Sequence, residues 1–409
     1  MTSRGELAAR DQADPLAELR QGFDLPAGLV YLNGNSLGPL THAARQRLRA
    51  LVDEEWGQGL VGSWNTADWV GLPERVGARI APLIGAAPDE VIATDSISIN
   101  LYKLLTAACR LRPGRAVILS EAGDFPTDSY IAASVAEASG LTFRRVPREQ
   151  LPDAINEDVA ALLLGHVSYR DGYRQPLPAL CAAARQKGAL TLWDLAHSAG
   201  AVPLDLDGTG ADFAVGCGYK FLNGGPGAPA FAYAARRWHD ALSQPLTGWF
   251  GHARPFDFVA DFEAALDLRS LQSGTPGILG LSALDAALTV FEGIDMDALH
   301  RRSIELFDLF LALGDPWLAD AGFSLLTPRD PAQRGSQISL RHPQAQWITN
   351  ALAAQGVIGD FRPPDILRLA LTPLYTRRVD IWEAATRLQT IMREAQWQRA
   401  EHQISRTVT

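Results

Sequence analysis

The stretch that most constrains the fold lies at residues 189–229, where two short apolar runs each end in polar side chains. The first run leads to Asp194 and His197. The second leads to Tyr219 and Lys220, which a glycine-rich turn follows directly. Apolar runs of this length, bounded by turn residues, are typical of buried strands. We therefore predict that two strand ends converge and bring a carboxylate, an imidazole, a phenol and an amine together.

This set of side chains suits pyridoxal phosphate. A lysine amine bonds to the aldehyde of that cofactor, and a carboxylate pairs with its ring nitrogen so that the ring acts as an electron sink. Taken alone, a lysine is more often a solvated surface charge, and Asp194 is equally compatible with a helix N-cap. Lys220, however, lies in the uncharged segment VGCGYKFLNGG, so we expect its amine to be largely enclosed.

The motifs resemble those of the kynureninase family, pyridoxal-phosphate enzymes with the aspartate-aminotransferase fold. The resemblance rests on WDLAHSAGAVPLDL and CGYKFLNGGPG and extends to YLNGNSLGPL (31–40), DFPTDSY (124–130), LTGWFGH (246–252), QSGTPGIL (272–279) and LRLALTPLYT (367–376). It therefore spans almost the whole chain. It implies hydrolysis of the Cβ–Cγ bond of L-kynurenine to anthranilate and L-alanine in tryptophan catabolism, and leaves 3-hydroxy-L-kynurenine open as a second substrate.

Apolar runs alternate with helical patterns from about residue 90 to 235, which predicts parallel βαβ units with helices on both faces of a sheet. Active sites in such sheets lie beyond the carboxyl ends of the strands. The expected fold class is α/β, with a mainly parallel, seven-stranded sheet of fold type I and a smaller α+β C-terminal domain. We expect an N-terminal arm and helix at 1–60 that packs with the small domain, a large cofactor domain at 61–290 and the small domain at 291–409.

The resemblance assigns cofactor contacts to several of these strand ends. It places the phosphate on the main-chain N–H of Ile97 and the hydroxyl of Ser98, at a turn that Asp95 or Ser96 could equally cap as an ordinary helix start. It places Phe125 on the ring face and Asp194 on the ring nitrogen. The full expected set is Ile97, Ser98, Phe125, Pro126, Thr127, Asp128, Asp194, His197, Tyr219, Lys220, Trp249 and Thr275.

Two further expectations concern this part of the chain. Thr127 or Asp128 is a plausible cap for the helix that starts there. Gly165 stands where relatives usually carry a Ser or Thr that bonds the cofactor, and Ser168, three residues later, is the alternative.

The resemblance makes Lys220, Tyr219 and Asp194 catalytic, with Tyr219 as a proton relay and His197 orienting Asp194 or the ring. Arg368 is expected to hold the substrate carboxylate, although an internal salt bridge would equally satisfy a buried arginine.

Three more residues are expected at the substrate. Trp64 could stack on the substrate ring or belong to the core. Asn35 and Ser36 could cover the substrate or lie in an ordinary turn.

Partners and location follow from composition and from the same resemblance. The Trp249 and Thr275 loops are expected to cross the interface of a homodimer with shared active sites. The net charge of −9 argues against nucleic acid and anionic membranes, and no apolar run approaches about 18 residues. Cys109, Cys181 and Cys217 show no metal-ligand spacing and indicate a reducing compartment. The N-terminus lacks the apolar core of a signal peptide, so we expect a cytoplasmic protein without a metal.

Two other readings remain. A cysteine desulfurase or selenocysteine lyase of the same fold needs a nucleophilic cysteine on a mobile loop and commonly has His before the lysine, where this chain has Tyr219. A non-catalytic protein on this fold would bind the cofactor or a partner without turnover. The presence of Lys220, Asp194 and Arg368 together argues against that second reading.

Overall fold

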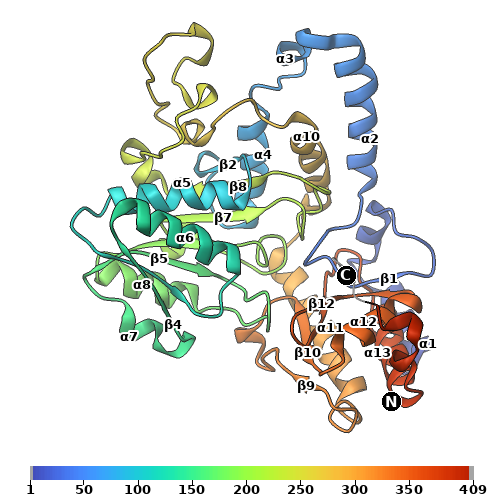
Figure 1. Ribbon diagram of the computed structural model, residues 1–409. Helices are drawn as coiled ribbons and strands as arrows, with labels where there is room; N and C mark the ends of the chain where they lie inside the picture. Colours follow the sequence, from blue (N-terminus) through green and yellow to red (C-terminus); the bar gives the residue numbers. More distant parts are fainter. Residues whose placement is uncertain (1–2, 405–409) are drawn as a thin grey trace.

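A computed structural model of the protein describes residues 3–404 and shows two lobes (Figure 1). The larger lobe is built on a seven-stranded sheet, and the smaller lobe on a four-stranded antiparallel sheet. The predicted fold class, a mainly parallel sheet with a smaller α+β unit, is confirmed.

The large sheet positions the chain ends that the sequence singled out. Its strands are parallel except β8, which runs antiparallel to both neighbours. In spatial order they are β2 Val91–Ala93, β8 Ala230–Ala234, β7 Phe213–Cys217, β6 Leu190–Asp194, β5 Val159–Gly165, β3 Val117–Glu121 and β4 Thr142–Val146. The two apolar runs near residues 190 and 213 are thus the neighbouring, parallel strands β6 and β7.

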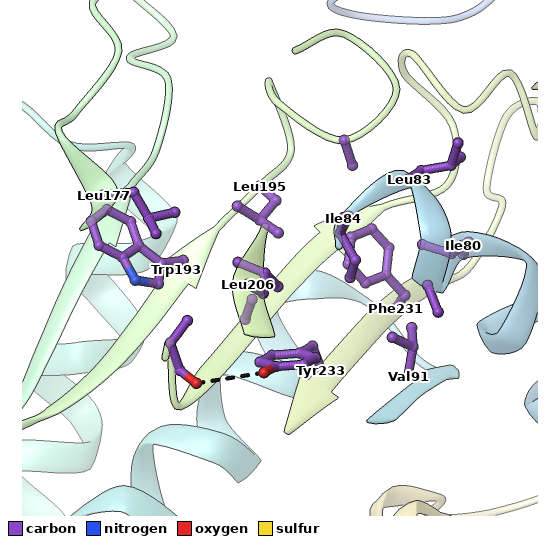
Figure 2. Close-up of a cluster of buried hydrophobic side chains, with 14 of the residues drawn as sticks. Ile80, Leu83, Ile84, Val91, Leu177, Trp193, Leu195, Leu206, Phe231 and Tyr233 are labelled. Carbon is purple, nitrogen blue, oxygen red and sulfur yellow. Dashed lines mark hydrogen bonds between the residues drawn. The ribbon is translucent and has the colours of Figure 1, made fainter. Parts of the chain in front are cut away.

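The strands are apolar on both faces because helices cover both. Successive side chains of a strand point to opposite faces, so Leu192 packs with one layer and Trp193 with the other. Helices α5 Ile97–Arg110 and α6 Pro126–Ser139 cover the first face (Figure 1). Helices α4 Leu72–Ile80, α8 Leu177–Gln186 and α10 Ile278–Ala287 cover the second, whose cluster includes Trp193, Phe231 and Tyr233 (Figure 2).

The smaller lobe has its own apolar core between its sheet and three helices. The sheet order is β12 Asp360–Arg362, β13 Ile366–Ala370, β10 Gln337–Arg341 and β9 Ser324–Leu325. The helices are α11 Met296–Gly314, α12 Ala345–Ala354 and α13 Arg378–Arg393. Helix α11 follows α10 of the larger lobe after a short 3-10 turn at Leu288–Phe291.

The N-terminal segment joins the smaller lobe before the chain enters the larger one. Helix α1 Arg4–Gln12 packs on α13, and β1 Val30–Tyr31 pairs in parallel with β11 Val357–Ile358. The chain then rises through α2 His42–Ala50 toward α3 Ser63–Thr66 (Figure 1). The remaining helices are α7 Leu151–Ala154 and α9 Leu206–Thr209. Within residues 3–404, no helix is both long and apolar enough to cross a membrane.

The contact between α4 and β2 yields a test of the packing. A Cβ at Gly77 would overlap the carbonyl oxygen of Val91 and lie 2.6 Å from its carbonyl carbon. Gly77→Ala should therefore lower the free energy of unfolding by roughly 1–3 kcal/mol through overpacking. The matched helical control is Gly5→Ala in α1, where the nearest atom lies 4.0 Å away and alanine should stabilise by up to about 1 kcal/mol. Thermal unfolding followed by circular dichroism measures both, and a gain for Gly77→Ala would contradict the close approach.

Candidate active site

The candidate site lies at the carboxyl ends of β5, β6 and β7. Gly165 pairs in register with Asp194, and Asp194 with Val215, so these ends lie side by side. A cavity of about 230 Å³ opens above them. Its lining includes the predicted residues Ile97, Ser98, Phe125, Thr127, Asp128, Asp194, His197, Tyr219 and Lys220. The structure thus brings nine of the twelve expected cofactor residues together.

Lys220 and His197 form the centre of this lining. Their Nζ and Nε2 atoms lie 3.2 Å apart, and Nζ is 5.9 Å from the centroid of the Phe125 ring. Lys220 is half-buried, so its amine is less enclosed than expected. Burial, together with the positive charge of Lys220, holds the pKa of His197 well below its ordinary value. The imidazole is therefore neutral beside the amine.

Lys220 differs from the other lysines of the chain in its position at the cavity. The chain contains three lysines. Lys103 is fully buried and bonded to Asp95, and Lys187 forms an exposed ion pair with Glu157. Of the three, Lys220 alone borders the cavity.

Two interacting carboxyl groups, those of Asp128 and Asp194, border the same cavity. Asp194 accepts the N–H of Ala196 at 2.8 Å, whereas no N–H or O–H group of residues 3–404 donates to either oxygen of Asp128. Burial raises the pKa of both, and repulsion from Asp194 raises that of Asp128 strongly, while Lys220 favours the charged form of Asp194. We conclude that a shared proton resides on Asp128 and that Asp194 keeps its charge.

A third carboxyl group, Asp124, borders the same cavity and was not predicted. Both of its oxygens accept the N–H of Gly165, at 3.1 and 3.0 Å. A Cβ at Gly165 would lie 2.6 Å from Asp124 Oδ1, so this aspartate occupies the space of a side chain there. Ser168 lies outside the lining, and its hydroxyl accepts backbone N–H groups of its own turn.

The N-terminus of α5 points its first turn at the cavity. Ser96 caps the helix and accepts the N–H of Ile99, which selects Ser96 over Asp95 as the cap. Asp95 instead has a left-handed backbone (φ 49°) and pairs with buried Lys103 at 2.5 Å. Because Lys103 also donates to the Leu271 carbonyl, it ties this turn to the 268–271 segment.

The predicted cap of α6 was wrong. Phe125 is the N-cap residue and Pro126 occupies the first helical position, outside the cavity lining. Proline favours that position because its fixed φ suits the helix and its missing N–H would be unpaired anyway. Thr127 and Asp128 are consequently free to face the cavity. Phe125 packs edge-on against Tyr169, with ring centroids 5.1 Å apart.

Arg368 has an internal partner, which is the alternative that the sequence left open. It lies opposite Asp360 in the β12–β13 pair and bonds that carboxylate through Nε at 2.7 Å and Nη2 at 2.5 Å. Both side chains are 1% exposed. Arg362 also binds Asp360, at 2.9 Å, and Ser36 bonds the same carboxylate. Within the described residues, two guanidinium groups therefore share one carboxylate.

The remaining predicted residues lie outside the cavity. Thr275 borders a neighbouring cavity of about 520 Å³ with Trp56 and Trp69. The ring centroids of Trp249 and Phe250 lie 4.4 Å apart, and the Trp64 ring contacts both Trp69 and Phe250. Asn35 is buried and donates to Gln337 at 3.5 Å. Its segment nonetheless reaches the site, because the N–H of Gly38 donates to the Tyr219 carbonyl at 2.8 Å.

The lining fits the expected cofactor. An ionised carboxylate (Asp194) suits a ring nitrogen, the amine of Lys220 an aldehyde, and a helix N-terminus a phosphate. Phe125 is 41% exposed as a residue and borders the cavity, where the flat ring of the cofactor would cover its apolar side chain. The N–H or lone pair at His197 Nδ1 is buried without a hydrogen-bond partner among residues 3–404.

Sequence reasoning missed Asp124, Tyr169, Asp360 and Arg362. A signal existed for Asp360, because GDFRPPDILRL alternates charged and apolar residues around a proline turn and so resembles a hairpin. No comparable signal existed for Asp124, since its neighbour Gly165 is 41 residues away.

The chain is similar to curated kynureninases along its whole length. It is 48% identical over 417 residues to the kynureninase of Burkholderia mallei (strain SAVP1) and 46% identical over 416 residues to that of Pseudomonas fluorescens, and each match covers 100% of both chains. Residues 299–388 match the kynureninase C-terminal domain. An apo cysteine desulfurase from Thermococcus onnurineus NA1 shares the fold, with a TM-score of 0.78, 16% identity and coverage of 92% of this chain and 98% of that one.

The buried pair of Arg368 and Asp360 yields a stability test. Asp360→Asn removes the charge that compensates two guanidinium groups, and loss of one partner of a buried pair costs roughly 3–5 kcal/mol. The matched control is Asp315→Asn, whose bidentate pair with Arg329 is exposed and should cost less than about 1 kcal/mol. Urea unfolding measures both free energies, and equal losses would rule out a buried role for Asp360.

Proposed function

The chain belongs to the kynureninase family, and we propose that it hydrolyses the Cβ–Cγ bond of L-kynurenine, releasing anthranilate and L-alanine. Pyridoxal 5′-phosphate is its cofactor. The observation that carries the proposal is the juxtaposition of Lys220, His197 and Asp194 in one cavity, with 3.2 Å between the lysine and histidine nitrogens. In the net reaction, the hydroxyl of water joins the γ-carbonyl carbon and its hydrogen joins Cβ, so the atoms balance.

We propose distinct roles for the three central side chains. The bound cofactor supplies an electron sink that stabilises negative charge formed at the substrate Cα. Asp194 holds a proton on the ring nitrogen, which requires it to stay ionised. Lys220 anchors the cofactor and, once displaced, takes the Cα proton, since its amine borders the cavity. His197 is neutral and lies 3.2 Å from the Lys220 amine. It can therefore orient the amine through a hydrogen bond without adding a positive charge beside it.

Tyr219 is the proposed proton relay. Burial raises the pKa of its phenol above the ordinary range, so the hydroxyl keeps its proton and can donate it when the Cβ–Cγ bond breaks. The remaining cofactor contacts follow the lining. We assign the phosphate to the Ile97 N–H and the Ser98 hydroxyl, the ring face to Phe125, and the adjacent wall to Thr127 and Asp128. Pro126 lies between Phe125 and Thr127 in the chain, outside the lining, and is proposed to hold this turn in place.

Arg368 remains the proposed anchor of the substrate carboxylate. Support comes from local charge, because Arg362 and Arg368 share Asp360 and leave one positive charge that a substrate anion would balance. Arg362 is the more accessible of the two, with 34% of its side chain exposed. Ser36 contacts both arginines, which supports the proposal that Asn35 and Ser36 border the substrate.

A desulfurase function is less supported. Cys181 and Cys217 are buried, and Cys109 is half-buried within α5. Burial raises the pKa of the Cys109 thiol to about 12 and raises those of the other two. All three cysteines of the chain are therefore poor nucleophiles, and none lies on an exposed loop.

We also propose a cytoplasmic homodimer with shared active sites. Exposed apolar side chains gather on two segments that extend from the same end of the molecule, at 52–61 and 249–266 (Figure 1). Surfaces of this kind mark interaction sites. In such a dimer Trp249 and Thr275 would reach the partner's phosphate, and Trp64 the substrate ring. The three free cysteines suit a reducing compartment.

The division into units at 1–60, 61–290 and 291–409 is part of the same proposal. Separate apolar cores in the two lobes support it, as does the presence of Val30 and Leu32 in the core of the smaller lobe.

Activity and lysine identity can be tested together. Purified protein should convert L-kynurenine to fluorescent anthranilate, and borohydride reduction followed by peptide mapping should find the cofactor on Lys220. Lys220→Ala should retain the fold and lose on the order of a thousandfold in turnover. Lys187→Ala, at an exposed ion pair, should behave as wild type. Absence of anthranilate from the cofactor-loaded wild type would refute the function.

The dimer has its own test. Phe258 and Leu266 are 77% and 79% exposed, and Phe258→Asp combined with Leu266→Asp would place like charges in the interface. The dimer dissociation constant should rise at least about tenfold, as measured by sedimentation equilibrium. Ile404→Asp, at an exposed residue of the smaller lobe, should leave it unchanged. A fully active wild-type monomer would contradict the shared sites.

A further inference from the structure

We propose that Asp124, reaching over Gly165, donates a hydrogen bond to the phenolic oxygen of bound pyridoxal phosphate and so acts as a cofactor-positioning residue. The inference rests on the proposed function for the identity of the cofactor, and it adds a residue and a protonation state. Asp124 lies in the loop between β3 and α6, one strand beyond Gly165 and two beyond Asp194 in the sheet.

The position of the Asp124 carboxyl group leaves no room for a side chain at residue 165. The carboxyl group sits 3.0–3.1 Å from the Gly165 N–H. Since an added Cβ at Gly165 would approach Asp124 Oδ1 to 2.6 Å, even alanine there would displace the carboxyl group. The aspartate thus fills the place where a hydroxyl-bearing side chain on β5 would stand, and it carries oxygen atoms to the same wall.

The strand order indicates which part of the cofactor this wall meets. In pyridoxal phosphate, the phosphate arm and the phenolic oxygen lie on opposite sides of the line from the ring nitrogen to the aldehyde carbon. Asp194 on β6 and Lys220 after β7 define the two ends of that line. The turn proposed to bind the phosphate, at Ile97 and Ser98, follows β2. In the sheet, β7, β8 and β2 lie on one side of β6, and β5 and β3 lie on the other side. The phenolic oxygen therefore faces Gly165 and Asp124.

The charges around Asp124 decide which form of the carboxyl group is present. Asp194 on β6, Glu121 on β3 and Asp128 on α6 are acidic neighbours. The N–H groups of Gly165 and Phe125 favour the anion, and Lys220 across the cavity is the nearby cation. Burial, reinforced by Glu121 and Asp194, raises the pKa of Asp124 to about 7. A protonated carboxyl group can keep one oxygen on the Gly165 N–H and donate from the other.

This arrangement separates the two aspartates by role. Asp194 stays ionised and holds a proton on the ring nitrogen, whereas Asp124 is neutral below its own pKa and acts there as a donor. Environments that push the pKa values of two carboxyl groups apart commonly assign them such separate roles. When pH rises through the pKa of Asp124, the donor is lost and a negative charge appears beside the phenolic oxygen. The visible absorption of the bound cofactor should respond, because the phenolic oxygen is conjugated with the ring.

The test compares three variants with wild type by two readouts. The first is the dissociation constant for pyridoxal phosphate, from fluorescence quenching of the apoprotein. The second is the visible spectrum of the holoenzyme between about pH 5.5 and 9. Asp124→Asn offers an amide donor that does not titrate, so affinity should stay within about threefold while the spectral step near pH 7 disappears. Asp124→Ala should bind the cofactor about ten- to a hundredfold more weakly.

A compensating variant separates contact from fold. Asp124→Ala combined with Gly165→Ser places a hydroxyl in the vacated space and should recover most of the lost affinity. Asp153→Asn, at an exposed residue in α7, is the control and should match wild type in both readouts. Circular dichroism checks folding, and the near-isosteric Asn variant keeps the test decisive if Asp124→Ala fails to fold.

The outcomes are distinguishable. Wild-type affinity in Asp124→Ala, or an unchanged spectral step near pH 7 in Asp124→Asn, would overturn the proposal. A wild-type protein that binds the cofactor but does not cleave L-kynurenine would refute the proposed function and leave the contact decided by the binding and spectral data. A wild-type protein that binds no cofactor would overturn both.

Discussion

The site depends on keeping one carboxylate charged in a pocket that holds three. Asp124, Asp128 and Asp194 border the same cavity, and like charges at close range in a poorly solvated space cannot all ionise. The amine of Lys220 and the N–H of Ala196 favour the charge on Asp194. Burial and repulsion between the carboxyl groups raise the pKa of the two other aspartates, which favours their protonated forms. The sheet makes this possible, because it places the ends of β3, β5 and β6 at successive positions along one edge.

A second electrostatic balance links the smaller lobe to this edge. Arg368 and Asp360 are cross-strand partners with almost no exposed surface, and Arg362 shares the same carboxylate. The carbonyl of Tyr169, from the larger lobe, also accepts from Arg368. Because Tyr169 packs on Phe125, the buried arginine and the proposed ring-binding wall belong to one connected set of contacts. A shift of the smaller lobe would therefore move Tyr169 and, through it, the Phe125 ring that is proposed to pack on the cofactor.

Residues 33–38 of the N-terminal segment contact the site from both lobes. Gly38 donates to the Tyr219 carbonyl, and Ser36 binds Asp360 and both arginines. Residues 33–38 thus contact both the loop that carries Tyr219 and Lys220 and the two arginines, Arg362 and Arg368. A Cβ at Gly38 would lie 2.7 Å from the Cα of Asn223, so the approach of these two backbones requires glycine. This close contact explains why the turn that contains Asn35 and Ser36 ends in a glycine.

The sequence by itself determined the alternation of strands and helices and the two converging strand ends, because buried parallel strands read as apolar runs and their polar termini must share one edge. The resemblance to kynureninases supplied most of the remaining residues of the cavity lining. Only the tertiary structure decided that Arg368 pairs with Asp360 and that Asp124 fills the space over Gly165. Each of these depends on which residues of distant segments meet. Local pattern specifies the period and the ends of an element, whereas steric exclusion and the sharing of charge among buried groups arise once the chain is packed.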